Sequence, residues 1–162
     1  MAPKILGVGD VGVTKDPGGV LKTFALGSCV AVILLDPAQK AVGMVHVALP
    51  KSKTNPERAK QKPGYFADTG LALLFEQMAD LGCDPRGKGM VVKLAGGAKV
   101  LDMDTRFDIG KKNALAVKKH LWKLGLGPVS EDIGGHHSRT VELDRDSGRV
   151  TISSSTGETW EI

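Results

Sequence analysis

The amino-acid sequence predicts an α+β fold, in which two long amphipathic helices pack in layers on one or more mostly antiparallel β-sheets. Short runs of apolar and β-branched residues, separated by turn-forming residues, predict strands joined in consecutive hairpins. Two well-separated segments repeat apolar residues at the helical period instead, which predicts helices. Because the hairpins surround the helices rather than alternate with them, the pattern argues against a doubly wound parallel sheet.

Length and composition predict a single domain that spans residues 1–162. Apolar residues make up 41% of the chain and charged residues 25%, which is ordinary for a globular protein. The N-terminal residues are too short and too broken by glycine for a signal peptide, and the longest apolar run, residues 30–35, is too short to span a membrane. We therefore expect a cytoplasmic protein without membrane insertion, in a compartment where thiols stay reduced.

The first elements are predicted to be strands. Residues 5–14 alternate small and β-branched residues, which predicts one strand interrupted by bulges. A turn follows at Asp16-Pro17-Gly18-Gly19, and a second strand starts at Val20 and leads to Cys29.

The next two strands form the hairpin on which the functional hypothesis depends. Residues 30–35 and 41–47 are apolar runs around an Asp-Pro turn, a pattern typical of adjacent antiparallel strands. With a two-residue tip that starts at Pro37, Cys29 lies directly opposite His46, and their Cβ atoms are about 4.5–5.5 Å apart. A three-residue tip would shift the register by one residue and put the two side chains on opposite faces.

Cys29 is a candidate nucleophile on chemical grounds. A neighbouring imidazole such as that of His46 lowers the pKa of a thiol by stabilising the thiolate. The preceding Gly27 and Ser28 allow the backbone to bend and to offer N–H groups to a developing oxyanion. The alternative is structural, because a cysteine beside an apolar strand is more often a small buried hydrophobic residue. The residues alone leave both interpretations open.

The second half of the chain contains both predicted helices. Residues 51–64 are rich in lysine, proline and glycine and predict a loop. A helix is predicted at 68–81, with Asp68 as its N-cap and Gly82 after its end, and another at about 110–124, between Asp108 and Gly125. The remaining predicted strands are residues 90–95, 129–133, 140–143 and 149–153.

No metal site, cofactor site or nucleic-acid site is predicted. The two cysteines form no Cys-x-x-Cys pattern, and Cys83 stands outside any motif. His136 and His137 are adjacent, so on an extended chain they point to opposite faces, without a third ligand at a suitable spacing. The formal net charge is +4, the lysines are spread along the chain and aromatic residues make up only 4%. This composition suits an acidic protein partner at least as well as nucleic acid.

Several separate motifs, in order, resemble the CheD family of chemoreceptor glutamine deamidases. The likeness is carried by residues 23–32 (TFALGSCVAV), 43–50 (GMVHVALP), 65–69 (YFADT), 94–98 (LAGGA), 108–113 (DIGKKN) and 131–135 (EDIGG). The resemblance covers nearly the whole chain, and it implies a fold and chemistry similar to the deamidase domain of cytotoxic necrotizing factor toxins.

The resemblance also implies a reaction and a site. The expected activity is conversion of glutamine side chains of chemoreceptor cytoplasmic domains to glutamate, with release of ammonia and without a cofactor. The family's catalytic group falls on Cys29, His46 and Thr23, where Thr23 would orient the imidazole, and Gly27 and Ser28 are the expected substrate-binding residues. The receptor domains implied are acidic coiled coils, which fits the basic charge of this chain.

Two alternative functions remain open at this stage. The first is an interaction protein that binds and regulates a CheC-type phosphatase, the partner that the resemblance also implies. Members of the family often carry an aromatic residue in a short helix that contacts CheC, whereas this chain has Leu101 there and Phe107 nearby. The second is a methylesterase that uses the same cysteine on receptor methyl esters through the same acyl-thioester route.

Overall fold

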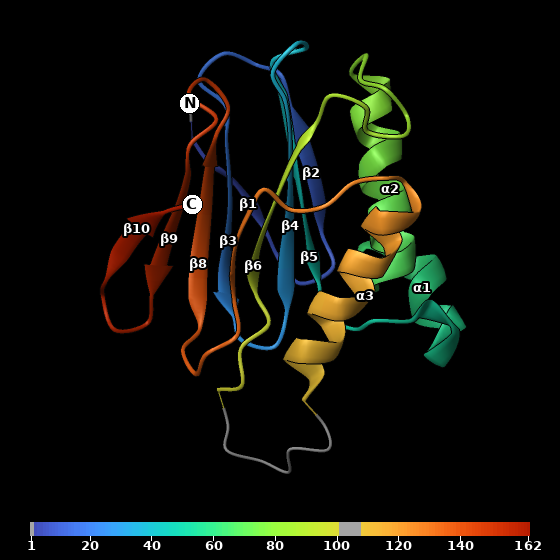
Figure 1. The fold of residues 1–162 in the computed structure, drawn as a ribbon, viewed down its shortest axis with the longest axis vertical. Coiled ribbons are helices and arrows are strands. Elements are labelled where there is room, and N and C mark those ends of the chain that lie inside the picture. The colour runs from blue at the N-terminus through green and yellow to red at the C-terminus, as the bar shows by residue number, and fades with distance from the viewer. Residues whose placement is uncertain (1, 101–107) are drawn as a thin grey trace.

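Two β-sheets and a layer of helices are stacked in the order sheet, sheet, helices (Figure 1). A computed structural model of the chain describes residues 2–100 and 108–162, and Leu101 and Phe107 lie outside these ranges. Most strand pairs are antiparallel and both long helices are present, so the predicted α+β class is confirmed.

The first sheet is the outer layer and has five strands in the order β1-β3-β8-β9-β10. Its strands are β1 (Lys4–Leu6), β3 (Val20–Leu26), β8 (Arg139–Asp144), β9 (Val150–Ser154) and β10 (Thr159–Glu161). β1 runs parallel to β3, and the other pairs are antiparallel. The predicted C-terminal hairpin is confirmed as β8 and β9, whereas β10 lies in a segment for which the sequence predicted no strand.

The second sheet lies between the first sheet and the helices, in the order β2-β5-β4-β6-β7. Its strands are β2 (Val11–Thr14), β5 (Ala41–Val47), β4 (Val30–Asp36), β6 (Val91–Gly96) and β7 (Ser130–Ile133). Every residue of β4 and β5 is buried, because both faces of these central strands are covered. This explains why both strands are continuous apolar runs.

The prediction of one bulged strand over residues 5–14 is wrong. The segment forms β1 and β2, which belong to different sheets. The chain crosses between the sheets through a tight turn in which the carboxylate of Asp10 accepts the N–H of Gly7 at 2.7 Å. Gly9 in this turn has a φ of 81°, a conformation that favours glycine.

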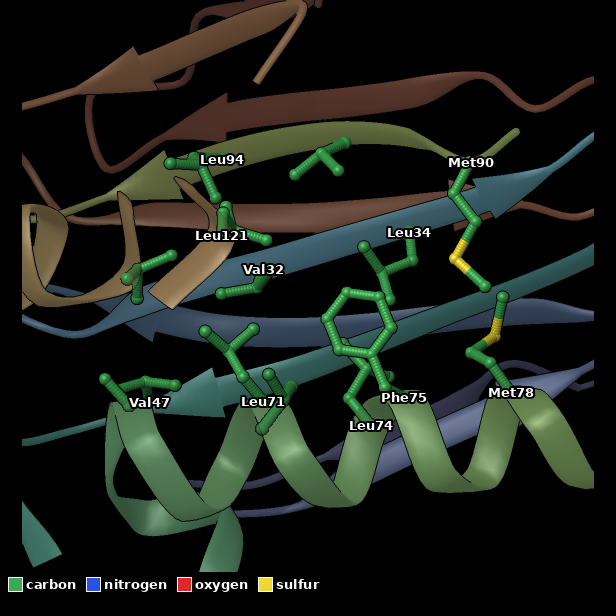
Figure 2. Close-up of a cluster of buried hydrophobic side chains, with 14 of the residues drawn as sticks. Val32, Leu34, Val47, Leu71, Leu74, Phe75, Met78, Met90, Leu94 and Leu121 are labelled. Atoms are coloured by element: carbon green, nitrogen blue, oxygen red, sulfur yellow. The ribbon is translucent and has the colours of Figure 1, made fainter. Parts of the chain in front are cut away.

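The two long helices cover the outer face of the second sheet. They are α2 (Ala67–Asp80) and α3 (Ile109–Lys123), and their apolar faces form one core cluster with β4, β5 and β6 (Figure 2). Gly82 and Gly125 follow the helix ends with positive φ, as predicted. The carboxylate of Asp108 caps α3 by accepting the N–H of Lys111 at 3.0 Å.

The predicted N-cap of α2 is wrong. The N-cap position is occupied by Phe66, which makes no side-chain capping bond, and Asp68 lies inside the first turn. The carboxylate of Asp68 accepts the hydroxyl of Ser52 at 2.6 Å and its N–H at 3.0 Å instead. A carboxylate in the first turn still interacts favourably with the helix dipole.

The predicted loop over residues 51–64 is also wrong, because this segment forms short helices. They are η1 (Ser52–Thr54), α1 (Pro56–Gln61) and η2 (Pro63–Tyr65). The side chain of Asn55 caps α1 by accepting the N–H of Arg58, and Pro56 occupies the first helical position. Proline is compatible with that position because its missing N–H would have had no partner there. None of the helices in the described ranges is long and apolar enough to cross a membrane.

A second core cluster fills the space between the two sheets. It combines residues of β3, β8 and β9 with residues of β4 and β5, among them Leu21, Ile33, Met44, Val141 and Ile152. The loop between β3 and β4 and the C-terminal end of β5 lie at the same end of this sandwich (Figure 1). The candidate functional residues lie at this end.

Candidate active site

The register of the β4–β5 hairpin differs from the predicted one. Asp36 pairs with Ala41, so the tip holds four residues instead of two, and His46 lies opposite Ala31. The tip is stabilised by the carboxylate of Asp36, which accepts the N–H of Gln39 at 3.2 Å, and Lys40 ends it with a φ of 51°. The prediction that Cys29 directly opposes His46 is therefore wrong.

The correction leaves both side chains on the same face of the sheet. The register is displaced by two residues, and side chains alternate between faces with a period of two. Cys29 precedes the first residue of β4 by one position and packs against the core cluster between the sheets. It is a diagonal neighbour of His46 instead of a direct one, and such neighbours are about 7–8 Å apart at the backbone. No hydrogen bond joins them within the described residues.

Thr23 and His46 are in contact across the space between the two sheets. Thr23 Oγ1 lies 2.7 Å from His46 Nδ1 and 2.7 Å from the carbonyl oxygen of Leu6. The carbonyl can only accept, so the single hydroxyl proton of Thr23 is donated to Leu6. The contact with His46 then requires a proton on Nδ1, which leaves Nε2 of the neutral ring as a proton acceptor.

The environment of His46 favours the uncharged imidazole. The residue is 1% exposed, and Nε2 is buried without a hydrogen-bond partner among residues 2–100 and 108–162. Burial lowers the pKa of the His46 imidazole from 6.5 to about 4, although the nearby Asp10 carboxylate acts in the opposite direction. A neutral ring with a free Nε2 is the form required of a general base at neutral pH.

Cys29 is a thiol and not a thiolate in this environment. Burial raises the pKa of the Cys29 thiol above its usual value of 9.0. The imidazole beside it is uncharged, so it provides no positive charge to stabilise a thiolate. This differs from the expected lowering of the thiol pKa, which assumed a charged or closely bonded imidazole. The pair is therefore a neutral thiol and a neutral imidazole.

The backbone before Cys29 is held by a set of hydrogen bonds to its carbonyl groups. The carbonyl of Gly27 accepts the N–H of Ala98 at 2.8 Å, and that of Cys29 accepts the N–H of Gly97 at 2.8 Å. The carbonyl of Ser28 accepts the side-chain amide of Asn113 at 2.9 Å. The N–H groups of Ser28 and Cys29 make no hydrogen bond in residues 2–100 and 108–162, so these donors are available for an oxyanion.

Two features around the site were not assigned a role from the sequence. Asn113 is fully buried in α3, and the only signal for it was its place in the resemblance motif. Leu6 contributes through its backbone carbonyl, so its side chain gives no signal. The backbone of Gly96 also lies close to the candidate nucleophile, because a Cβ placed there would lie 2.2 Å from the carbonyl oxygen of Cys29.

The remaining cysteine and histidines lie apart from these groups. Cys83 is buried in the core next to the helices, and burial together with the Asp36 carboxylate raises the pKa of its thiol to about 11. His136 and His137 are exposed. In the part of the chain that the structure describes, no group of three or more His, Cys, Asp or Glu side chains is arranged to hold a metal ion.

Known proteins similar to this chain share one description. Residues 48–154 match the family model for CheD, described as CheD chemotactic sensory transduction. The chain is 56% identical over 162 residues to the "Probable chemoreceptor glutamine deamidase CheD" of Syntrophotalea carbinolica, with 100% of both chains covered. It is 47% identical over 149 residues to a protein of Anaeromyxobacter dehalogenans named "Probable chemoreceptor glutamine deamidase CheD 2", with 92% of each chain covered.

A third relative has the same printed function without the qualifier. It is the "Chemoreceptor glutamine deamidase CheD" of Thermotoga maritima, 38% identical over 149 residues, which cover 92% of this chain and 90% of the relative. The family model begins after Thr23, Cys29 and His46, whereas the full-length alignment with the Syntrophotalea protein includes all three.

Proposed function

The chain belongs to the CheD family, and on that premise we propose that it is a chemoreceptor glutamine deamidase that uses Cys29 as nucleophile. His46 is the general base and acid, and Thr23 orients its ring. The observation that carries these roles is the hydrogen bond between Thr23 and His46 Nδ1. It leaves the buried Nε2, on the face where Cys29 lies, without a partner among the residues that the structure describes.

The first half of the reaction forms a thioester. The sulfur of Cys29 attacks the carbon of the glutamine amide, the thiol proton passes to His46 Nε2, and the C=O electron pair moves to oxygen. The N–H groups of Ser28 and Cys29 stabilise this oxyanion. Collapse of the intermediate breaks the C–N bond, and His46 returns its proton to the departing nitrogen, which leaves as ammonia.

The second half restores the enzyme. His46 removes a proton from water, which attacks the thioester carbon. The C–S bond then breaks and His46 returns the proton to the departing sulfur, which gives glutamate, the free thiol and the neutral base. Thr23 is uncharged, so it does not stabilise the imidazolium formed in each half of the reaction as the carboxylate of a Ser-His-Asp triad does. Substrate binding brings the sulfur to hydrogen-bonding distance of Nε2, since catalytic hydrogen bonds often tighten only in the complex.

The family premise and the basic charge support a substrate of acidic receptor segments. We place the reaction in the cytoplasm, carried out by one deamidase domain spanning residues 1–162. No observation favours the methylesterase or the CheC-binding alternative over this reaction. The test below distinguishes both from a deamidase.

The test measures ammonia released from purified receptor cytoplasmic fragments, together with the mass of the fragments. Wild type should release ammonia and add about 1 Da per modified glutamine, whereas loss of a methyl group would indicate an esterase. Cys29→Ala and His46→Ala should abolish release, while the matched control Cys83→Ala, which removes the other thiol, should retain it. Absence of ammonia with wild-type enzyme would contradict the deamidase proposal and favour the binding protein.

A further inference from the structure

Asn113 is a buried polar residue that the reaction described above does not use. Its side chain is 0% exposed and lies on the inward face of α3, beside Ala114 and Val117 of the core cluster. Burying an amide among apolar side chains is unfavourable unless hydrogen bonds replace those lost to water. The hydrogen bonds of the Asn113 side chain therefore explain why an amide occupies this buried position.

Both amide hydrogens of Asn113 are donated to backbone carbonyls. Nδ2 lies 2.9 Å from the carbonyl oxygen of Ser28 and 2.9 Å from that of Ala48. Because both partners are acceptors, the orientation of the amide is fixed with its nitrogen toward them. Oδ1 is buried and has no hydrogen-bond partner in the described part of the chain. The residue thus contributes through its two donors.

The two carbonyls belong to the segments that carry the candidate nucleophile and base. Ser28 immediately precedes Cys29, and Ala48 follows His46 by two residues. One side chain therefore ties the loop before β4 to the end of β5. The tie acts at the end of the sheet where the β4–β5 pairing stops, beyond the Val30–Val47 pair.

Asn113 can reach the two carbonyls because the start of α3 packs closely on the sheet. A Cβ on Gly110 would lie 2.5 Å from the carbonyl carbon of Gly97, so the first turn of α3 packs directly on the backbone after β6. The N–H of that same Gly97 donates to the carbonyl of Cys29. Gly97 therefore contacts both the first turn of α3 and the loop that carries Cys29.

We propose that Asn113 is a positioning residue for deamidation, which holds the Ser28 carbonyl so that the N–H of Cys29, in the same peptide plane, faces the oxyanion. The catalytic role rests on the proposed function, whereas the hydrogen bonds of Asn113 do not. Without the donor, the Ser28–Cys29 peptide loses the hydrogen bond that fixes its plane, and only the flanking carbonyls of Gly27 and Cys29 are still held, so its N–H is directed less tightly. Transition-state stabilisation then falls while substrate binding is unaffected, so kcat decreases and KM stays the same.

The experiment compares Asn113→Ala with Val117→Ala, which removes a fully buried side chain one turn later on the same helix without touching either carbonyl. Both are assayed for ammonia release at a temperature at which circular dichroism shows them folded. Asn113→Ala should lower kcat by about 10- to 100-fold with KM changed less than about threefold, a part of the loss seen when an oxyanion donor is removed. Val117→Ala should keep the wild-type kcat. Equal kcat values for the two variants would overturn the proposal.

A second readout is independent of the receptor substrate. A ¹³C-labelled propionaldehyde adds to the Cys29 thiol, forming an S–C bond and transferring the thiol proton to the aldehyde oxygen, which occupies the oxyanion position. Its dissociation constant, measured by NMR against a Cys29→Ala blank, should rise at least about tenfold in Asn113→Ala, as expected for a misdirected oxyanion donor, and stay at the wild-type value in Val117→Ala. An unchanged constant in Asn113→Ala would overturn the positioning role.

The two readouts separate failure of the proposal from failure of the proposed function. A wild-type enzyme that binds aldehyde but releases no ammonia contradicts deamidation, and the aldehyde comparison alone then decides the role of Asn113. If Asn113→Ala does not fold, Asn113→Leu, which has a similar volume and no donor, replaces it with the same expected results. Failure of both variants to fold would show a purely structural residue and overturn the proposal.

Discussion

Thr23 Oγ1 and His46 Nδ1 lie 2.7 Å apart although their strands, β3 and β5, belong to different sheets. The carbonyl of Leu6, on the edge strand β1, takes the hydroxyl proton and so determines which ring nitrogen of His46 is protonated. Orientation of the candidate base is therefore fixed by the packing of one sheet on the other.

Removal of the Thr23 hydroxyl should impair turnover more than folding. Thr23→Val keeps the shape of the side chain but leaves His46 Nδ1 and the Leu6 carbonyl without a partner, so the ring is no longer held in one tautomer. We expect kcat for ammonia release to fall by about 10- to 100-fold, a part of the effect of general acid–base catalysis. Thr151→Val, on β9 of the same sheet, is the control and should keep wild-type kcat.

Stability should depend on pH through His46. The folded-state pKa of its imidazole is lowered from 6.5 to about 4, so folding requires the neutral ring. The contribution is fully present above the unfolded-state pKa of 6.5 and is lost as pH falls toward 4. Urea unfolding at pH 7 and pH 4 should show that the wild type loses about 3 kcal/mol more than His46→Gln.

The control for this measurement is His137→Gln, which removes an exposed imidazole. It should lose stability between pH 7 and pH 4 as the wild type does. Identical pH dependence in wild type and His46→Gln would contradict the proposed burial of a neutral ring.

The rate at which Cys29 is alkylated should rise with pH, because its thiol has to lose a proton before it reacts. Burial raises the pKa of its thiol above 9.0, so the thiolate is a minor species at neutral pH. In a Cys83→Ala background, the iodoacetamide rate should rise about tenfold per pH unit between pH 6 and pH 8.5. A rate that is constant across this range would indicate a preformed thiolate–imidazolium pair and refute the neutral pair.

A side chain at position 96 should displace the nucleophile. Gly96 has a φ of 112°, and a Cβ there would lie 2.2 Å from the carbonyl oxygen of Cys29. Gly96→Ala should therefore abolish ammonia release as well as lower stability. Gly89→Ala is the matched control, because Gly89 also has a positive φ but no heavy atom within 4 Å of the added Cβ. It should lose only about 1–2 kcal/mol of stability and keep its activity.

Arg139 should be important for stability, because it is a buried cation that joins both sheets. Its guanidinium donates to the carbonyls of Gly96 and Gly134 and pairs with Asp132 at 3.1 Å. Arg139→Ala should lower the free energy of unfolding by about 3–5 kcal/mol, measured with urea, because it leaves the Asp132 carboxylate without its cation and removes the guanidinium donor from two carbonyls.

The control for Arg139 is a surface ion pair of the same sheet. Arg149 pairs with Glu161 at 3.2 Å, with side chains that are 62% and 56% exposed. Arg149→Ala should change stability by less than about 1 kcal/mol. Similar losses in both arginine variants would contradict the distinction between buried and exposed pairs.

The helices and central strands were predictable because their signals are local. The apolar period and end glycines of α2 and α3, and the continuous apolar runs of β4 and β5, follow from residues close in sequence. The division of residues 5–14 between two sheets was not predictable in this way, because a bulge and a crossing turn look alike in a glycine-rich segment. Two of the short helices after Ala48, α1 and η2, were obscured by the prolines that begin them.

The sequence predicted that Cys29 and His46 share one end of a hairpin, but not the register of that hairpin. The four-residue tip depends on Lys40 adopting a positive φ, which its residue type does not indicate. Cys29 and His46 nevertheless lie on one face, because a shift of two residues preserves the alternation. The roles of the Leu6 carbonyl and of Asn113 required the structure, since each depends on contacts between segments far apart in sequence.

Separation of the candidate catalytic groups between two sheets has a consequence during synthesis and folding. Cys29 and His46 come from the layer next to the helices, and Thr23 from the outer layer. In the proposed mechanism, a nascent or half-assembled chain with only one layer in place lacks an oriented base, and its cysteine would not attack amides in neighbouring proteins. Hydrolytic capacity therefore arises only when the sandwich closes.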